Sequence, residues 1–210
     1  MNWFLRIFGI KRAGGLIGRF GLSKWWYSTF SDEERKVIRQ VTANSSFSKL
    51  DRGDASGLLY SKGGFLCVLT SCFSRKDRRP IGRRIALEAE RNLASVKETV
   101  NLHFAIHDLV EFWYACRHDF TDAREAAMRT CRAQVQIARS VKKALRSEDR
   151  KLGGPHDDVG HAGYDRLCMM LKEEGQTVEA AEVAKDAKRY WGGNWDRFIH
   201  PEKPKKKTHQ

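Results

Sequence analysis

The sequence predicts an all-α fold built from antiparallel helix pairs, and three observations support this. Residues 164–172 and 177–191 read as two short amphipathic helices that can bury their apolar faces only against each other. Residues 100–117 are apolar on most sides, which is typical of a helix buried at the centre of a bundle. Residues 121–147 place apolar and basic side chains on opposite faces at helical spacing, which indicates one long helix packed on that bundle.

A capping box predicts where the first regular helix of the chain begins. In Ser31-Asp32-Glu33-Glu34 the Ser31 hydroxyl can accept from the backbone of the first turn, while Glu34 reaches back to the backbone of Ser31. A helix over residues 32–42 is therefore expected. Residues 43–64 are rich in Ser, Gly and Asp and are expected to form a loop.

Two further segments complete the N-terminal half. Residues 65–74 form an apolar run too short for periodicity to separate a strand from a buried helix. We expect a helix, because everything after this run has helical patterning. The next helix should begin within residues 77–80, with Pro80 in its first turn. Its apolar stripe consists of Ile85, Ala89, Leu93 and Val96.

The chain divides into an arm, one domain and a tail. Residues 1–30 form a basic aromatic arm with an apolar run near its start. That run is shorter than the roughly 20 residues of a membrane span, and its charges follow it, unlike those of a signal peptide. The arm either packs on the domain as an ordinary helix, lies on a membrane surface, or docks on nucleic acid or a partner. Residues 31–200 are expected to form a helical-repeat domain, and residues 201–210 a basic disordered tail.

Composition restricts the class of protein and of partner. The chain has 210 residues, of which 41% are hydrophobic and 31% charged, so it belongs with globular and not with disordered proteins. Its formal net charge of +13 favours nucleic acid, an acidic protein surface or an anionic lipid face, unless the protein is simply basic. Five cysteines without a C-x-x-C pair indicate reduced, buried thiols, which predicts a cytoplasmic location.

The last helix pair resembles a tetratricopeptide repeat. That repeat has large, Leu, small and large positions on its first helix, which are filled here by Tyr164, Leu167, Cys168 and Leu171. The small positions of its second helix are filled by Ala180, Ala184 and Ala187. The pair over residues 100–147 fits more loosely, because Gln134 replaces its last small residue. The resemblance implies a scaffold that binds peptides or proteins on a concave face.

A polar stripe on the 100–117 helix is the candidate partner-binding site. Four-four-three-four spacing places its members on one side of the helix and at its C-terminal edge; they are His103, His107, Glu111, Tyr114 and His118. First helices of the resembling family line the concave groove, so we expect these residues to contact a partner segment. The alternatives are a partly buried helix whose polar groups bond internally, and a divalent metal shared by two histidines.

No pattern predicts a metal site, a cofactor or catalytic residues. A structural zinc site needs four ligands, and the chain offers no fixed second pair. His107-Asp108 resembles the helical His-Asp pair of HD-type metal phosphohydrolases, but those also have an earlier histidine and none precedes His103 here. In the loop over residues 148–160, Asp157 or Asp158 is expected to cap the next helix more readily than to bind a cation.

A basic face on the 121–147 helix is the second candidate site. Its members fall on one side of the helix, with Gln136 in the only gap; they are Arg129, Arg132, Arg139, Lys143 and Arg146. Between residues 124 and 151 nine basic residues stand against three acidic ones. A phosphate backbone would release counterions to such a face, so the face either binds nucleic acid or is simply solvated.

These observations lead to a non-enzymatic protein–protein interaction scaffold as the expected function, with a partner segment held in a helical groove. The alternative is a nucleic-acid-binding protein that uses the basic helix face and the basic arm. A metal-dependent hydrolase is the third and weakest hypothesis.

Overall fold

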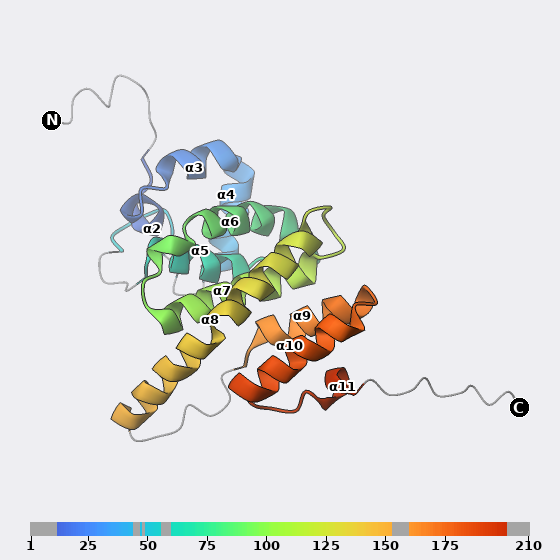
Figure 1. The fold of residues 1–210 in the computed structure, drawn as a ribbon. Helices are drawn as coiled ribbons and strands as arrows, with labels where there is room; N and C mark the ends of the chain where they lie inside the picture. Colours follow the sequence, from blue (N-terminus) through green and yellow to red (C-terminus); the bar gives the residue numbers. More distant parts are fainter. Residues whose placement is uncertain (1–11, 44–46, 48, 56–59, 153–159, 201–210) are drawn as a thin grey trace, which may run out of the picture. The chain divides into compact units, whose positions relative to one another are not determined.

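The computed structural model confirms an all-helical fold (Figure 1). It describes residues 12–43, 47, 49–55, 60–152 and 160–200. The chain forms two compact units, residues 1–95 and residues 96–210, which are described separately below as unit 1 and unit 2. This division differs from the arm of residues 1–30 and single domain of residues 31–200 expected from the sequence.

Unit 1 consists of short helices joined by turns. Its elements are α2 (Gly15–Arg19), α3 (Ser23–Thr29), α4 (Asp32–Thr42), α5 (Lys62–Ser71), η1 (Lys76–Arg78), α6 (Arg79–Arg91) and η2 (Leu93–Ser95). The helix over residues 32–42 is thus confirmed. The apolar run at residues 65–74 is helical as expected, but α5 begins at Lys62, inside the segment predicted to be a loop, and ends at Ser71. Both halves of the predicted capping box form, since Ser31 accepts from the Glu34 amide and the Glu34 carboxylate accepts from the Ser31 amide. Pro80 lies in the first turn of α6 as expected.

The described part of the N-terminal arm is part of the core of unit 1. Leu16, Ile17 and Trp26 are fully buried, and the Trp26 indole donates to Asp51, which also binds Arg39. These contacts fit the expectation that the arm packs as ordinary helices. The apolar run at its start lies outside the described residues, so membrane contact by that run stays a prediction.

Unit 2 consists of long helices. They are α7 (Thr99–Cys116), α8 (Ala123–Leu152), α9 (Ala162–Glu173) and α10 (Thr177–Tyr190), followed by the single turn α11 (Asp196–Ile199). α7 packs on α8, α9 packs on both, and α10 packs on α9 and along α8. α8 runs five residues beyond the predicted end at residue 147, because no helix breaker occurs before Gly153.

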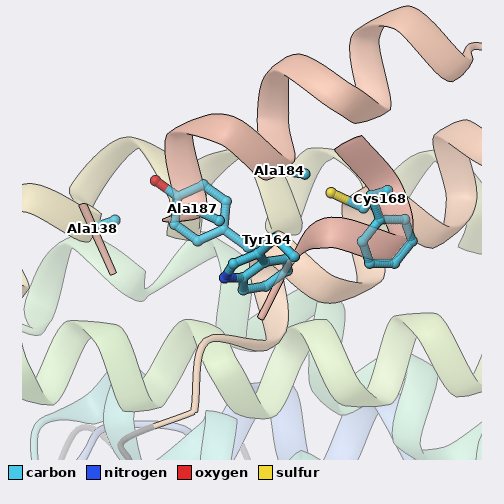
Figure 2. Close-up of a cluster of buried hydrophobic side chains, with 7 residues drawn as sticks. Ala138, Tyr164, Cys168, Ala184 and Ala187 are labelled. Atoms are coloured by element: carbon cyan, nitrogen blue, oxygen red, sulfur yellow. The ribbon is translucent and has the colours of Figure 1, made fainter. Parts of the chain in front are cut away.

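The α9–α10 pair is joined by a turn at Gly175, which adopts a φ of 75°. Small residues on α10 let the two helices approach closely, as Figure 2 shows for Ala184 and Ala187 beside Tyr164 and Cys168. All four side chains are at most 1% exposed. The predicted burial of these two faces against each other is therefore confirmed, which is the central element of the expected fold.

Among the helices of the described ranges, none combines the length and the apolar character that crossing a lipid bilayer requires. The tail over residues 201–210 and the loop aspartates Asp157 and Asp158 lie outside these ranges.

Candidate functional site

The predicted partner-binding stripe on α7 is largely occupied by contacts within unit 2. His103 is fully buried, and Glu111 pairs with Arg166 of α9 at 3.1 and 3.2 Å. Tyr114 lies between the guanidinium groups of Arg166 and Arg117, which approach its ring centroid to 4.7 and 4.0 Å. The structure therefore uses these residues to seat α9 on α7.

The two remaining stripe residues are more accessible. His107 is half-buried, and His118 is exposed just past the end of α7. They lie eleven positions apart, about 16 Å along a helix axis, so they form no joint contact surface once the residues between them are taken. The described residues therefore do not form the groove expected from the sequence, in which all five side chains would be free to contact a partner.

A cluster of two buried histidines lies where α7, α8, α9 and the end of α10 meet. We call His103, His161, Gln134 and Trp191 the histidine cluster. The His103 and His161 ring centroids are 5.2 Å apart, and Trp191 stacks on His103 at 5.3 Å and meets His161 edge-on at 4.5 Å. His161 is 5% exposed and caps α9 by accepting from the Tyr164 amide. The sequence analysis missed this role, because histidine is an uncommon cap and its pairing with His103 is non-local.

Hydrogen bonds fix the tautomer of both rings. The Gly163 amide donates to Gln134 Oε1 at 2.6 Å, so Gln134 Nε2 must be the donor that faces the His103 carbonyl oxygen at 3.2 Å and its Nδ1 at 3.4 Å. His161 Nδ1 likewise accepts an N–H, from Tyr164. Since a neutral imidazole has one donor and one acceptor, each ring carries its proton on Nε2. Both Nε2 atoms are buried without a hydrogen-bond partner.

Burial keeps both rings neutral. It lowers the pKa of His103 to about 4 and that of His161 to about 3, with repulsion between neighbouring histidines as a smaller cause. Backbone groups oppose this lowering, that of Gly160 at His103 and those of His161 and Gln134 at His161, although none forms a hydrogen bond of normal geometry with an Nε2 atom.

The histidine cluster does not fit a metal ion. A ligating nitrogen must carry a free lone pair, but each Nδ1 is already occupied by a donor and each Nε2 holds the ring proton. Within the described residues no group of three or more His, Cys, Asp or Glu side chains could hold an ion. The nearby thiols are poor ligands as well, because burial raises the pKa of Cys131 and of Cys168 to about 12.

The basic face predicted on α8 is exposed along its whole length. Arg129, Arg132, Arg139, Lys143 and Arg146 are all accessible, and we call these five residues the cationic face. The opposite side of the helix is buried at Ala127, Cys131, Ala138 and Leu145. The predicted amphipathic character of this helix is therefore confirmed.

Part of the cationic face is neutralised by α10, which the sequence did not predict. Arg132 pairs with Glu179 at 3.2 Å, and Arg139 approaches Asp186 at 4.0 Å. Both pairs join residues 47 positions apart, so α8 and α10 run parallel in one register with a seven-residue repeat. The same register would place residue 193 opposite Arg146, but α10 ends at Tyr190 and residue 193 is a glycine.

Beyond the end of α10 the cationic face continues without a carboxylate from α10. Among the described residues, Lys143, Arg146 and Arg189 make no ion pair, and Lys142 lies over the Trp191 ring at 5.3 Å. We call Lys142, Lys143, Arg146 and Arg189 the cationic end. Two aromatic rings border it, since Arg139 and Arg189 flank Tyr190 at 3.7 and 5.2 Å.

Unit 1 contains a glycine-lined cavity of about 560 Å³ beside Arg19. Gly14, Gly15 and Gly18 form part of its wall. The amides of these three glycines donate to the carbonyls of Asp51, Gly53 and Gly14, respectively, so they are not available to a phosphate. This agrees with the sequence, which has no Gly-Lys-Ser/Thr ending for a phosphate-binding loop after these glycines.

Comparison of the chain with models of protein families, with curated proteins and with solved structures finds no match.

Proposed function

We propose that this chain is a non-enzymatic interaction protein whose cationic end binds an acidic segment of a partner protein. The tetratricopeptide resemblance of the α9–α10 pair supports a scaffold role. The binding surface differs from the one expected from the sequence, because the α7 stripe is engaged in packing. The five cysteines form no disulfide among the described residues, in agreement with the cytoplasmic location that is part of this proposal.

One observation supports this proposal most strongly. α8 already holds a segment of its own chain through carboxylates at seven-residue intervals, namely Glu179 on Arg132 and Asp186 on Arg139. At the next interval α10 offers no carboxylate to Arg146, because the helix has ended at Tyr190. An acidic side chain of a partner at that place would continue the chemistry that the protein uses internally, and charge complementarity would also speed its approach.

The partner segment would lie where α10 would continue if it extended beyond Tyr190. An acidic residue beside Arg146 would lie next to Lys143, one turn away on the same face. Lys142 and Arg189 would add positive potential from the flanks, and Trp191 offers a half-buried apolar surface. A short segment with acidic and aromatic residues therefore fits this surface better than a purely charged one.

Fluorescence anisotropy with a labelled peptide tests the proposal. A twelve-residue peptide of alternating Glu, Asp and Leu should bind at low salt and weaken as salt is added. The double substitution Lys143→Glu/Arg146→Glu should weaken binding about tenfold or more, because two attractive contacts become repulsive. Far-UV circular dichroism checks that the variant keeps its helices.

A matched control separates the site from the overall charge. Lys36→Glu/Lys97→Glu changes the net charge by the same amount at two exposed positions that are not part of the cationic face. This control should bind within about twofold of the unsubstituted protein. Equal weakening by both double variants would mean that only net charge matters, and the proposed site would be withdrawn.

Nucleic acid is the second candidate partner, favoured by the aromatic rings beside the cationic end. Tyr190 and Trp191 lie among Arg139, Lys142 and Arg189, and single-stranded nucleic acid is commonly bound by such combinations of cations and rings. A labelled 12-nucleotide single strand should then bind more tightly than the peptide of similar charge. Its affinity should fall steeply with the logarithm of salt concentration. Stronger binding of the peptide at every salt concentration would eliminate this candidate.

A further inference from the structure

The histidine cluster contains two buried Nε2 atoms that make no hydrogen bond of normal geometry, and the other hydrogen bonds of the cluster converge on one place in the fold. Gln134 receives the Gly163 amide and His161 receives the Tyr164 amide. These are consecutive amides in the first turn of α9, where a helix has no backbone acceptor for its N–H groups. The cluster therefore supplies the acceptors that keep this end of α9 closed.

Neutral rings are a condition for these contacts. Each ring already carries a proton on Nε2, so a second proton taken from solvent must bind to Nδ1. At His161 that proton would meet the Tyr164 N–H directly, and the cap would be lost. At His103 it would meet the Gln134 amide group, whose displacement would also withdraw Oε1 from Gly163. Protonation and the closed first turn of α9 exclude each other.

We propose that His103, Gln134 and His161 form a proton-sensitive latch, which holds the first turn of α9 while both rings are neutral and releases it when they take up a second proton.

The charges around the rings favour release over a protonated closed form. On α7, His107 adds repulsion to both rings, and on α8 Lys142 lies over the Trp191 ring that packs on them. Neither can neutralise an imidazolium.

The carboxylates on the other packed elements are bound elsewhere. Asp186 of α10 accepts from the Tyr164 hydroxyl at 2.6 Å and also lies near Arg139. Asp165 of α9 pairs with Arg166 and Arg197. A proton added to the cluster therefore has no described anion facing it, and opening of the turn is the way to solvate the charge.

Release of the latch would also change the proposed binding surface at the cationic end. Trp191 packs on both histidine rings and carries Lys142 on its ring, so loss of the cluster would disorder one flank of the cationic end. This last consequence rests on the proposed function, whereas the latch itself does not.

NMR spectroscopy on the ¹⁵N-labelled full chain tests the latch without any partner. At pH 7.5 the side-chain nitrogen shifts should show the Nε2–H tautomer for His103 and for His161. Between pH 7.5 and 5, hydrogen-exchange protection of the Gly163 and Tyr164 amides should fall about tenfold or more after correction for the intrinsic rate. Amides in the middle of α10 should change less over the same range.

Substitutions identify the groups responsible. His103→Leu/His161→Asn removes both titrating rings, while the Asn side chain keeps an acceptor for the Tyr164 amide, so its protection should not respond to pH. His118→Asn, at an exposed position, should respond like the unsubstituted protein. An Nδ1–H tautomer on either ring at pH 7.5, or protection that is the same at pH 7.5 and 5, overturns the latch even if the double variant does not fold. A chain that passes this test and fails to bind the acidic peptide at pH 7.5 keeps the latch and loses the proposed function.

Discussion

Mild acid should lower the free energy of unfolding of unit 2, because its two buried histidines are neutral in the folded chain. Their pKa values in the folded chain are about 4 and 3, against an ordinary value of 6.5. Because folding lowers these pKa values, their contribution to stability is complete above pH 6.5 and is lost as the pH falls below it. At pH 5 the loss is about 2 kcal/mol for each ring, or about 4 kcal/mol for both.

Asp108 on α7 works in the opposite direction. Burial raises the pKa of its carboxyl from 3.8 to about 6, so its charged form destabilises the folded chain at neutral pH. Acidification from pH 7.5 to 5 protonates this group and raises the free energy of unfolding by about 1.5 kcal/mol. The expected net loss for the unsubstituted protein is therefore about 2.5 kcal/mol. In Asp108→Asn the compensation is absent, and the loss should rise to about 4 kcal/mol.

Urea unfolding of the full chain measures this effect at pH 7.5, 6 and 5. Fluorine NMR of 5-fluorotryptophan reports unit 2 through the signals of Trp113, Trp191 and Trp195, separately from the tryptophans of unit 1. The range stops at pH 5 because the pKa of Glu173, lowered from 4.5 by the nearby Arg124 and Arg117, adds its own loss below that pH. A change below about 0.5 kcal/mol in the unsubstituted protein, or an unchanged loss in His103→Leu/His161→Asn, would refute the linkage to these rings.

Three substitutions test the helix packing of unit 2 and the helix capping of unit 1. Gly163→Ala should lower the stability of unit 2 by about 1–3 kcal/mol in urea titrations, because its Cβ would approach Gln134 Oε1 to 2.8 Å. The control Gly160→Ala has open space around its Cβ, so its stability should stay within about 0.5 kcal/mol of the unsubstituted protein. Ala184→Leu should cost about 1–3 kcal/mol by forcing α9 and α10 apart, and near-ultraviolet circular dichroism should show altered packing of the aromatic rings. Ser31→Ala should lower the stability of unit 1 by about 1 kcal/mol through loss of the α4 cap; unchanged stability in the tryptophan signals of unit 1 would contradict the role of this cap.

The helices of this chain could be predicted because their signals are local. The capping box at Ser31 fixed the start of α4, and the alanine spacing of α10 indicated a close neighbour before the neighbour was known. The basic face of α8 was also readable, since helical periodicity alone places its residues on one side. Each of these features depends on residues of a single helix and its cap.

The partners of the candidate site residues could not be predicted in the same way. Arg166 binds Glu111, and Glu179 and Asp186 lie beside the cationic face, across 47 to 55 positions of sequence. Nothing in the local pattern of α7 distinguishes a stripe that lines a groove from one that is paired internally. Gln134, which looked like a departure from the repeat pattern, proved to bridge α7 and the start of α9 by hydrogen bonds to His103 and Gly163.

The packing of small residues between α8, α9 and α10 has a chemical consequence for the cysteines there. With a pKa of about 12, the Cys131 and Cys168 side chains hold about a thousandfold less thiolate at neutral pH than an ordinary cysteine with a pKa of 9.0. Thiolate is the form that peroxide and alkylating reagents attack. Both sulfurs should therefore stay unmodified by oxidants while unit 2 is folded. Modification of either one would indicate that α8, α9 and α10 had separated.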